Sequence, residues 1–286
     1  MGQHWTDGAL AGKRIIVTGA AHGLGRSIAI ACVKAGGQVL FTARDDAALN
    51  EAVEESAPVA KQAATHVADL TRPDDVDGIY HAAVKAFGGV DVLINNAGVS
   101  NDSLRPDYWH NPVRYWETSA DTYRRFYEIN VQAPIRLCLM VTPEMRARNW
   151  GRLITTTTSL NTMIAGGMGP YGSSKAAIEA FTATMASDLA GTGVTANVIA
   201  PGGPADTRMI IADIPREDLI PVDCLAAPSV WLASHRSDGV TGRRYLGAQW
   251  DKTLPPEQAA EAASAPIAWT GFGARAYAPK GNARVE

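Results

Sequence analysis

A glycine cluster between two runs of different hydrophobic periodicity constrains the fold of this chain most strongly. Residues 14–18 form a short β-branched run, which predicts a buried parallel strand. The cluster spans Gly19 to Gly25, and an amphipathic helix is expected from about Arg26 to Ala35. Glycines let a backbone approach a phosphate closely, and free N–H groups at a helix start attract the anion. A simple turn is the alternative, but the position between a strand and a helix favours a nucleotide site.

Strands and helices alternate along most of the remaining chain. We expect further strands near 38–42, 64–68, 90–94, 151–159, 194–199 and 244–247, and helices near 46–56, 73–87, 121–148, 174–189 and 228–234. This alternation predicts an α/β fold with a single Rossmann-type doubly wound parallel sheet and helices on both faces. We expect one domain over 1–251, with a lid at about 207–225. Residues 252–286 show little pattern and are expected to form a C-terminal extension without a separate domain.

The end of the second expected strand indicates which dinucleotide is bound. Dinucleotide folds commonly carry an acidic residue there to bind the ribose hydroxyls, but this chain has Ala43 followed by Arg44. A small neutral residue followed by a guanidinium suits a 2′-phosphate, which arginine binds through two hydrogen bonds. NADP is therefore favoured over NAD. The alternative is a surface pair of Arg44 with Asp45 or Asp46.

Tyr171 and Lys175 lie four residues apart at the start of an expected helix, so their side chains share one face. A nearby cation favours the phenolate and lowers a phenol pKa from its reference value of about 10. A tyrosine whose pKa is closer to neutrality can act as a general acid or base. The spacing alone also fits a surface pair, but of the eight tyrosines only Tyr171 has a lysine four residues later.

These motifs together resemble the short-chain dehydrogenases/reductases over roughly residues 10–250. The order and spacing match that family in six motifs: Thr18-Gly19-x-x-x-Gly23-x-Gly25, Asp69, Asn95-Asn96-Ala97-Gly98, Asn130, Tyr171-x-x-x-Lys175 and Pro201-Gly202. Each motif is weak by itself, but six in sequence leave little room for accident. An aromatic segment near 105–115, a second glycine after Gly202 and the residues beyond 250 depart from the family's usual pattern. These departures leave the substrate undefined.

The resemblance implies a reaction and its catalytic residues. Hydride would pass between C4 of a nicotinamide and a carbonyl or carbinol carbon, with Tyr171 as the acid/base. Lys175 would lower the Tyr171 pKa and hold the nicotinamide ribose, and Asn130 would hold a water that relays protons. Counting without gaps puts the family's serine position at Thr158, whereas residue type favours Ser159. Side chains alternate along a strand, so only one hydroxyl should face the site; Ser159 is preferred and Thr158 stays open.

The resemblance also implies a set of cofactor contacts. Asp69 and Leu70 would contact the adenine, Asn95 would lie by the adenosine ribose, and Thr207 near the nicotinamide amide or the phosphates. His22 stands where members that prefer NADP often carry a basic residue. The expected cofactor-binding residues are Gly19, His22, Gly23, Leu24, Gly25, Arg44, Asp69, Leu70, Asn96, Ala97, Gly98, Tyr171, Lys175, Pro201, Gly202 and Thr207.

The expected function is the NADP(H)-dependent interconversion of a carbonyl and a secondary alcohol. Aromatic residues at 108–116 suggest a bulky or ring-shaped substrate, although the same side chains could pack in the core or on a neighbouring subunit. An NAD-dependent alcohol dehydrogenase of the same family is one alternative. A non-catalytic NADP-binding sensor or scaffold is another, because fold does not fix function.

Composition argues against several other classes of protein. The net charge of −3 provides no basic surface for nucleic acid, and no apolar run reaches the ~18 residues that span a bilayer. The six histidines lack metal-ligand spacing, so no metal is expected. Three scattered cysteines and an N-terminus without signal-peptide character favour reduced thiols and a cytoplasmic location. The family resemblance implies a homo-oligomer, either a dimer or a homotetramer.

Overall fold

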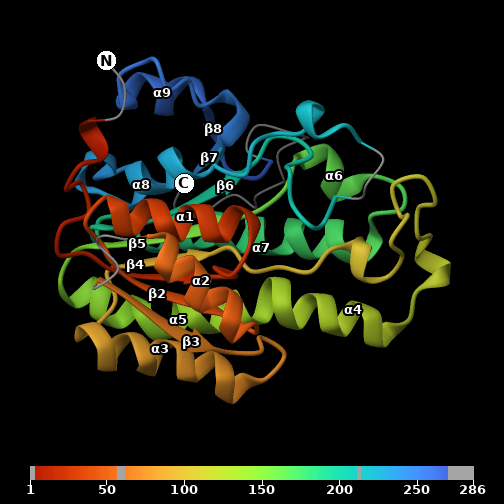
Figure 1. The fold of residues 1–286 in the computed structure, drawn as a ribbon, viewed down its shortest axis with the longest axis horizontal. Coiled ribbons are helices and arrows are strands. Elements are labelled where there is room, and N and C mark those ends of the chain that lie inside the picture. Colours follow the sequence, from red (N-terminus) through yellow and green to blue (C-terminus); the bar gives the residue numbers. More distant parts are fainter. Residues whose placement is uncertain (1–3, 57–61, 211–213, 270–286) are drawn as a thin grey trace, which may run out of the picture.

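The computed structural model describes residues 4–56, 62–210 and 214–269, in which the strands form one eight-stranded sheet (Figure 1). The strand order is β3-β2-β1-β4-β5-β6-β7-β8. Neighbouring strands from β3 to β7 are parallel, and β8 pairs with β7 in the antiparallel direction. The strands are β1 (Arg14–Thr18), β2 (Gln38–Ala43), β3 (Ala63–Val67), β4 (Val92–Asn95), β5 (Gly151–Thr156), β6 (Val194–Ala200), β7 (Arg243–Leu246) and β8 (Ser264–Pro266). The expected doubly wound sheet is confirmed.

Helices cover both faces of this sheet (Figure 1). Helices α1, α2 and α8 pack on one face, and α3, α5 and α7 pack on the other. Because side chains alternate along a strand, Ile15 and Val17 of β1 join the core under α1 and α8, whereas Ile16 joins the core under α3 and α5. The α-helices are α1 (Gly23–Lys34), α2 (Asp46–Glu55), α3 (Pro73–Phe87), α4 (Ala120–Tyr127), α5 (Ala133–Ala147), α6 (Leu160–Ile164), α7 (Gly169–Asp188), α8 (Ala226–Ala233) and α9 (Pro256–Ala262).

Local sequence signals explain where several of these elements begin and end. Helix α3 starts with Pro73 followed by two aspartates, and it ends at Gly88 in the left-handed conformation with φ 81°. Helix α2 begins where the Asp45 carboxylate accepts a hydrogen bond from the Ala48 N–H at 3.1 Å. The β-branched run of β1 is buried between β2 and β4. The elements up to β4 therefore lie close to their expected positions.

The long helical stretch expected over 121–148 is not one continuous α-helix. It consists of α4, a π-helical turn at Glu128–Gln132, and α5. Pro134 is the second residue of α5, directly after the π turn, and has no N–H to donate to that turn. Pro143 lies inside α5 without ending it. The wider π turn contains Asn130, and such turns occur frequently at functional sites.

Two segments that the sequence pattern left irregular contain regular structure. Helix α6 forms between β5 and α7, and the C-terminal extension contributes α9 and β8. In β8, Ser264 pairs with Tyr245 and Pro266 pairs with Arg243. A strand of three residues is too short to show a periodicity, which explains why the pattern did not reveal it. Its brevity and its proline blunt this edge of the sheet against further pairing.

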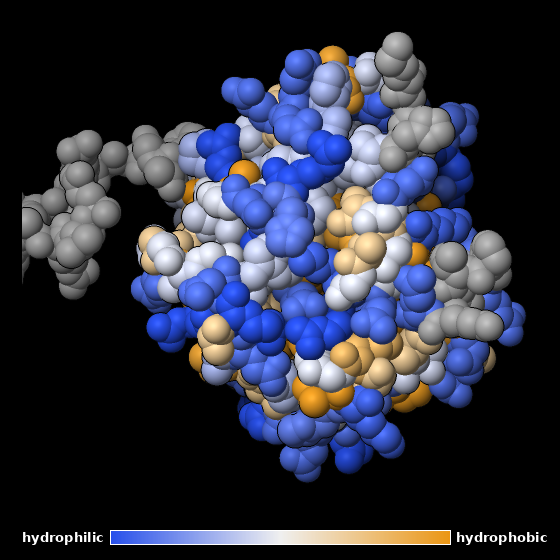
Figure 2. Space-filling view, turned by 90° about the vertical axis from the view of Figure 1, so that its left-hand side faces the viewer, coloured by the Kyte–Doolittle hydropathy of each residue, from blue (hydrophilic) through white to orange (hydrophobic). Residues whose placement is uncertain are grey.

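The end of the molecule where the parallel strands begin faces the viewer in Figure 2. Its surface is mainly hydrophilic, with hydrophobic residues in scattered patches. Within the described ranges, no helix combines the length and the apolar character needed to span a bilayer. The same residues contain no group of His, Cys, Asp and Glu that could hold a metal ion. The residues singled out by the sequence lie at the opposite end, where the strands finish.

Candidate active site

Hydrogen bonds join the carboxyl ends of β1, β4 and β5. The Thr18 hydroxyl oxygen accepts from the backbone N–H groups of Asn96 and Ala97, both at 3.0 Å. In return, Asn96 Nδ2 donates to the Thr18 carbonyl at 3.1 Å. The Thr156 hydroxyl, at the end of β5, donates to Asn96 Oδ1 at 3.4 Å. The segment that follows β4 is therefore fixed beside the glycine turn.

The glycine turn is packed so closely that side chains are excluded from it. Gly19 has φ 69°, which L side chains rarely adopt, and a Cβ on it would lie 2.8 Å from the Ala97 Cα. A Cβ on Gly25 would overlap the Gly19 carbonyl oxygen. A Cβ on Gly23, which has φ 54°, would lie 3.2 Å from the Thr207 methyl group. The turn thus has the bare backbone that an approaching phosphate requires.

Asn130 is buried in the π turn and connects segments that are far apart in the sequence. Its Oδ1 accepts from the Val99 N–H at 2.9 Å, and its Nδ2 donates to the Val99 carbonyl at 3.0 Å and to the Ser174 hydroxyl at 2.9 Å. A Cβ on Gly98 would lie 3.2 Å from Asn130 Oδ1 and 3.3 Å from Lys175 Nζ. The structure thus brings together the residues that follow β4, Asn130 and the start of α7. An asparagine inside a helix is usually exposed, but Asn130 is buried.

Tyr171 and Lys175 lie in the first two turns of α7. Lys175 Nζ is 6.0 Å from the centre of the Tyr171 ring and donates to the Thr156 carbonyl at 2.9 Å. Burial lowers the pKa of Lys175 from 10.5 to about 8. Burial also raises the pKa of Tyr171 from 10.0 to about 12, although a hydrogen bond with the Thr158 side chain opposes this rise.

Lys175 was expected to hold the Tyr171 pKa below its reference value, and for the protein without a bound cofactor this expectation is wrong. Desolvation of the phenol dominates, and the neighbouring Tyr108 and Asp102 raise the pKa further. The ammonium of Lys175 is directed at the Thr156 carbonyl, which takes up one of its three donors. A lower phenol pKa therefore requires additional positive charge or hydrogen-bond donors beside Tyr171.

Thr158 and Ser159 follow β5, and the structure places Thr158 against the phenol. The Thr158 side chain forms the hydrogen bond with Tyr171, and its backbone carbonyl accepts from the Arg244 guanidinium. Ser159 is instead the N-cap residue of α6, with an extended backbone. The chain turns into α6 at this point, so the alternation of side chains along a strand no longer decides between them. Residue type favoured Ser159, whereas the geometry favours Thr158.

The residues expected around the adenosine lie at the ends of β2 and β3. Arg44 is exposed, and among the described residues it has no ion-pair partner. Asp45 instead caps α2 and lies 3.6 Å from His22 Nε2. Asp69 Oδ1 accepts from the Thr71 N–H and hydroxyl, both at 2.9 Å; these bonds, helped by the charge of Arg44, hold the pKa of that carboxyl below its usual value. A free guanidinium beside a bare glycine turn fits a phosphorylated dinucleotide.

The remaining expected cofactor residues occupy the same edge, with one exception. Leu24 and Leu70 pack against the cores on the two faces of the sheet. After β6, the Pro201 carbonyl accepts from the Ala248 N–H at 2.9 Å, and Gly202 has φ 99°. The exception is Asn95, whose side chain is buried and donates to Cys138 Sγ at 3.5 Å. Asn95 therefore points into the core and away from the expected ribose position.

Asp102 and Tyr108 lie near Tyr171 and were missed by the sequence interpretation. Both groups raise the Tyr171 pKa, and burial raises the pKa of Asp102 itself. Asp102 Oδ1 is buried and has no hydrogen-bond partner in the described part of the chain. The aromatic segment was the only sequence signal, and it did not single out Tyr108, which is buried, from its exposed neighbours. Those neighbours are Trp109, Tyr115 and Trp116.

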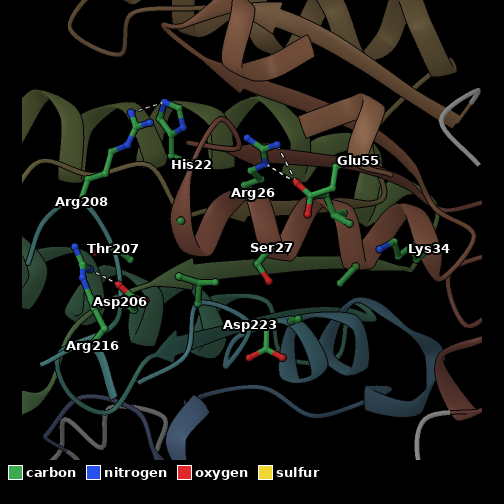
Figure 3. A pocket seen from close by; sticks show the side chains of 15 residues that line it. His22, Arg26, Ser27, Lys34, Glu55, Asp206, Thr207, Arg208, Arg216 and Asp223 are labelled. Carbon is green, nitrogen blue, oxygen red and sulfur yellow. Dashed lines mark hydrogen bonds and ion pairs between the residues drawn. The ribbon is translucent and has the colours of Figure 1, made fainter. Parts of the chain in front are cut away.

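A cavity of about 740 Å³ lies beside the glycine turn (Figure 3). One wall is the face of α1 from Gly23 to Lys34, and the other is formed by residues 206–208, Arg216 and residues between 222 and 226. Its volume is within the range of small-molecule sites. Figure 3 shows Arg208 and His22 directed toward each other across one end of this cavity.

The fold and the comparisons with known proteins define an oxidoreductase of Rossmann type. A family model for short chain dehydrogenases matches residues 13–217, and the chain belongs to this family. The 3-oxoacyl-[acyl-carrier-protein] reductase FabG of Vibrio cholerae is 31% identical over 193 residues, which cover 68% of this chain and 74% of that protein. The NADPH-dependent aldehyde reductase-like protein, chloroplastic, of Arabidopsis thaliana is 31% identical over 211 residues, which cover 70% and 75%. A crystal structure of a short-chain type dehydrogenase/reductase from Mycobacterium marinum matches with a TM-score of 0.70 and 28% identity, covering 82% of this chain and 92% of that chain.

Replacement of Lys175 by Met is expected to stabilise the protein at pH 7 and to have no such effect above pH 10.5. The folded-state pKa of about 8 lies below the unfolded value of 10.5, so the unfolded chain binds the proton more tightly. This penalty is fully present below pH 8 and disappears as the pH rises to 10.5. It amounts to about 3 kcal/mol, and the lost hydrogen bond to Thr156 reduces the gain to about 2 kcal/mol.

Denaturant unfolding of both proteins at pH 7 and pH 10.5 measures this difference. The buried thiols of Cys32 and Cys138, whose pKa values are raised to about 12, titrate equally in both proteins and cancel in the comparison. A stability difference independent of pH would show that the Lys175 pKa is not lowered.

Proposed function

We propose that the protein is an NADP(H)-dependent oxidoreductase that interconverts a carbonyl and a secondary alcohol, with Tyr171 as the acid/base. The observation that carries this proposal is the half-buried phenol of Tyr171, which is hydrogen-bonded to Thr158 and accompanied by the buried Lys175 at the carboxyl ends of β4 and β5. A non-catalytic NADP sensor or scaffold has no use for this arrangement. A polar cluster kept away from water suits proton transfer.

Different residues of this chain would bind the adenosine phosphate half and the nicotinamide half of the cofactor. The bare glycine turn and Arg44 would hold the phosphates, and Asp69 with Leu70 would lie by the adenine. Lys175 would hold the nicotinamide ribose, and Thr207 would lie over the turn from the segment after β6. The bound nicotinamide supplies or accepts the hydride at its C4 atom.

Tyr171 would then donate its proton to the substrate oxygen in reduction and remove it in oxidation. Moving the phenol pKa from about 12 toward neutrality requires ~7 kcal/mol of differential stabilisation. Lys175, once its ammonium is shared with the site, and the Thr158 hydroxyl are the protein groups placed to contribute. Asn130 fixes the Val99 backbone and the Ser174 hydroxyl next to them, and is the residue proposed to hold a proton-relaying water.

We propose a bulky or ring-shaped compound as the substrate, with Tyr108 as the aromatic side chain closest to the reaction. It lies close enough to Tyr171 to raise the pKa of that phenol, and its hydroxyl donates to the Met209 carbonyl at 3.5 Å. The names of the relatives refer to an oxoacyl carrier protein and to aldehydes, which all offer a carbonyl group. A cytoplasmic location and a homodimeric or homotetrameric state complete the proposal.

The cofactor assignment is tested by titrating the protein with NADPH and NADH and following nicotinamide fluorescence. We expect wild type to bind NADPH more tightly, because the exposed Arg44 forms no ion pair in the described ranges. Arg44→Asp should weaken NADPH binding by ~100-fold, because a carboxylate repels the 2′-phosphate, and should strengthen NADH binding. Lys34→Asp, with the same charge change at the far end of α1, is the matched control.

Equal affinities of wild type for both cofactors would instead support the NAD-dependent alcohol dehydrogenase. Following nicotinamide absorbance over a panel of ketones and aldehydes tests catalysis itself. Binding of NADPH without turnover of any of them would favour the sensor.

A further inference from the structure

The cavity beside the glycine turn contains several charged side chains, and most of them neutralise each other. Arg26 pairs with Glu55 at 2.8 Å, and Arg216 pairs with Asp206. Asp223 pairs with Lys252 at 2.7 Å. These ion pairs leave little net charge along the middle of the cavity.

Arg208 differs from these pairs, because its guanidinium faces the imidazole of His22 and not a carboxylate. Arg208 Nη1 lies 2.9 Å from His22 Nε2, and arginine can only donate, so the imidazole nitrogen accepts (Figure 3). Within the described part of the chain, Arg208 has no acidic partner. A guanidinium that bonds to a neutral imidazole retains its full charge and most of its donors. This end of the cavity therefore has unused capacity for an anion.

The position of His22 indicates which part of a dinucleotide would reach this pair. The His22 ring extends toward the end of β2, where its Nε2 lies 3.6 Å from Asp45 Oδ2. Asp45 directly follows Arg44, whose guanidinium is also without an ion-pair partner among the described residues. Arg208 thus contacts, through His22, the segment that follows β2, in which Arg44 lies.

The segment that carries Arg208 is attached to the glycine turn on one side and to the chain beyond it on the other. The Thr207 methyl group packs over Gly23, where a Cβ would lie 3.2 Å from it and the φ of 54° disfavours any other residue. Ala205 forms a β-bridge with Ile220, and the Asp206 N–H donates to the Ile220 carbonyl at 2.9 Å. A contact made by Arg208 with the cofactor would therefore hold the whole of 205–210 over the turn.

We propose that Arg208, together with His22, is a binding residue for the 2′-phosphate of the cofactor, opposite Arg44. This inference rests on the proposed use of NADP(H). It assigns to the segment after β6 a role in distinguishing the two dinucleotides, in addition to covering the glycine turn. When the phosphate binds, Arg208 exchanges the imidazole nitrogen for phosphate oxygens, and the imidazole can donate to them as well once its Nε2 has taken up a proton from the solvent.

The test measures binding of 2′,5′-ADP and of 5′-AMP by calorimetry, so it needs neither substrate nor turnover. These probes differ by the 2′-phosphate and share the adenosine and the 5′-phosphate. We expect Arg208→Gln to weaken 2′,5′-ADP binding by ~10-fold and to change 5′-AMP binding less than twofold. Arg208→Lys should retain part of the preference. Arg216→Gln combined with Asp206→Asn removes an ion pair without net charge from the same cavity; it is the matched control and should change neither probe.

Hydrogen exchange gives a second readout. The amides of 205–210 should exchange more slowly in wild type with 2′,5′-ADP than with 5′-AMP, and this difference should vanish in Arg208→Gln.

The outcomes separate the two proposals. If wild type itself binds both probes equally, the proposed NADP preference fails. If wild type prefers 2′,5′-ADP and Arg208→Gln keeps that preference, the role of Arg208 is refuted while the cofactor proposal stands. An equal loss for both probes would place Arg208 on the 5′-phosphate side and would also overturn the assignment made here.

Discussion

Replacing Tyr171 by Phe is expected to lower turnover by ~10²- to 10⁴-fold, the usual contribution of a positioned general acid or base. The substitution removes only the phenolic oxygen, and the ring keeps its place at the start of α7. NADPH binding should therefore stay within about twofold, because Lys175 and the glycine turn are untouched. Stopped-flow or steady-state absorbance gives the rate, and fluorescence titration gives the affinity. Turnover retained by the variant would remove Tyr171 from the mechanism.

The two neighbouring hydroxyls provide matched controls for this prediction. Thr158→Val keeps the shape of the side chain but removes the hydrogen bond to Tyr171, and a loss of ~10-fold or more is expected. Ser159→Ala should remain near wild type, because Ser159 serves as the N-cap residue of α6 without a side-chain capping bond. The reverse result would assign the substrate hydroxyl to Ser159, as the residue type suggested.

The sequence predicted those parts of the fold that depend on local signals. The β-branched run of β1, the glycine turn after it, and Pro73 at the start of α3 each have a local physical cause, and each stands where it was expected. The parallel order of the sheet follows from the alternation of strands and helices. The motif residues near Asn96, Asn130 and Lys175 also meet at the carboxyl edge, because that is where parallel strands and their loops converge.

Features of the site that depend on the tertiary environment could not be predicted from local sequence signals. The sign of the Tyr171 pKa shift depends on desolvation, and the lysine spacing says nothing about how much water reaches the phenol. The choice between Thr158 and Ser159 depends on where β5 ends and α6 begins. The contact of Arg208 with His22 joins residues from opposite walls of a cavity, and neither residue lies in a pattern that predicts the other.

A buried ion pair behind the candidate active site is a further feature of this kind, and its removal has the largest expected effect on stability. Arg244 of β7 and Glu179 of α7 form it at 2.8 Å, with side chains that are 5% and 0% exposed. Arg244 also donates to the Thr157 hydroxyl at 3.2 Å and to the Thr158 carbonyl. Glu179 Oε1 accepts from the Ala268 N–H at 3.2 Å, which ties the C-terminal extension to α7.

Glu179→Ala is expected to destabilise the protein by ~3–5 kcal/mol, because it leaves the Arg244 charge buried without its partner. The exposed pair of Arg26 and Glu55 is the matched control, and Glu55→Ala should cost less than ~1 kcal/mol. Denaturant unfolding, monitored by tryptophan fluorescence, measures both. A loss below 1 kcal/mol for Glu179→Ala would mean that water reaches Arg244.

The double replacement of Glu179 by Leu and Arg244 by Met separates stability from alignment of the site. Removing both charges together avoids an unpaired ion, so the folded state should recover most of the loss. The Thr158 carbonyl, however, would lose the donor that fixes it beside Tyr171. If the pair serves to position Thr158, the double variant should fold stably and bind NADPH normally, yet turn over ~10-fold more slowly. A double variant with wild-type turnover would show that the pair supports only the packing of β7 against α7.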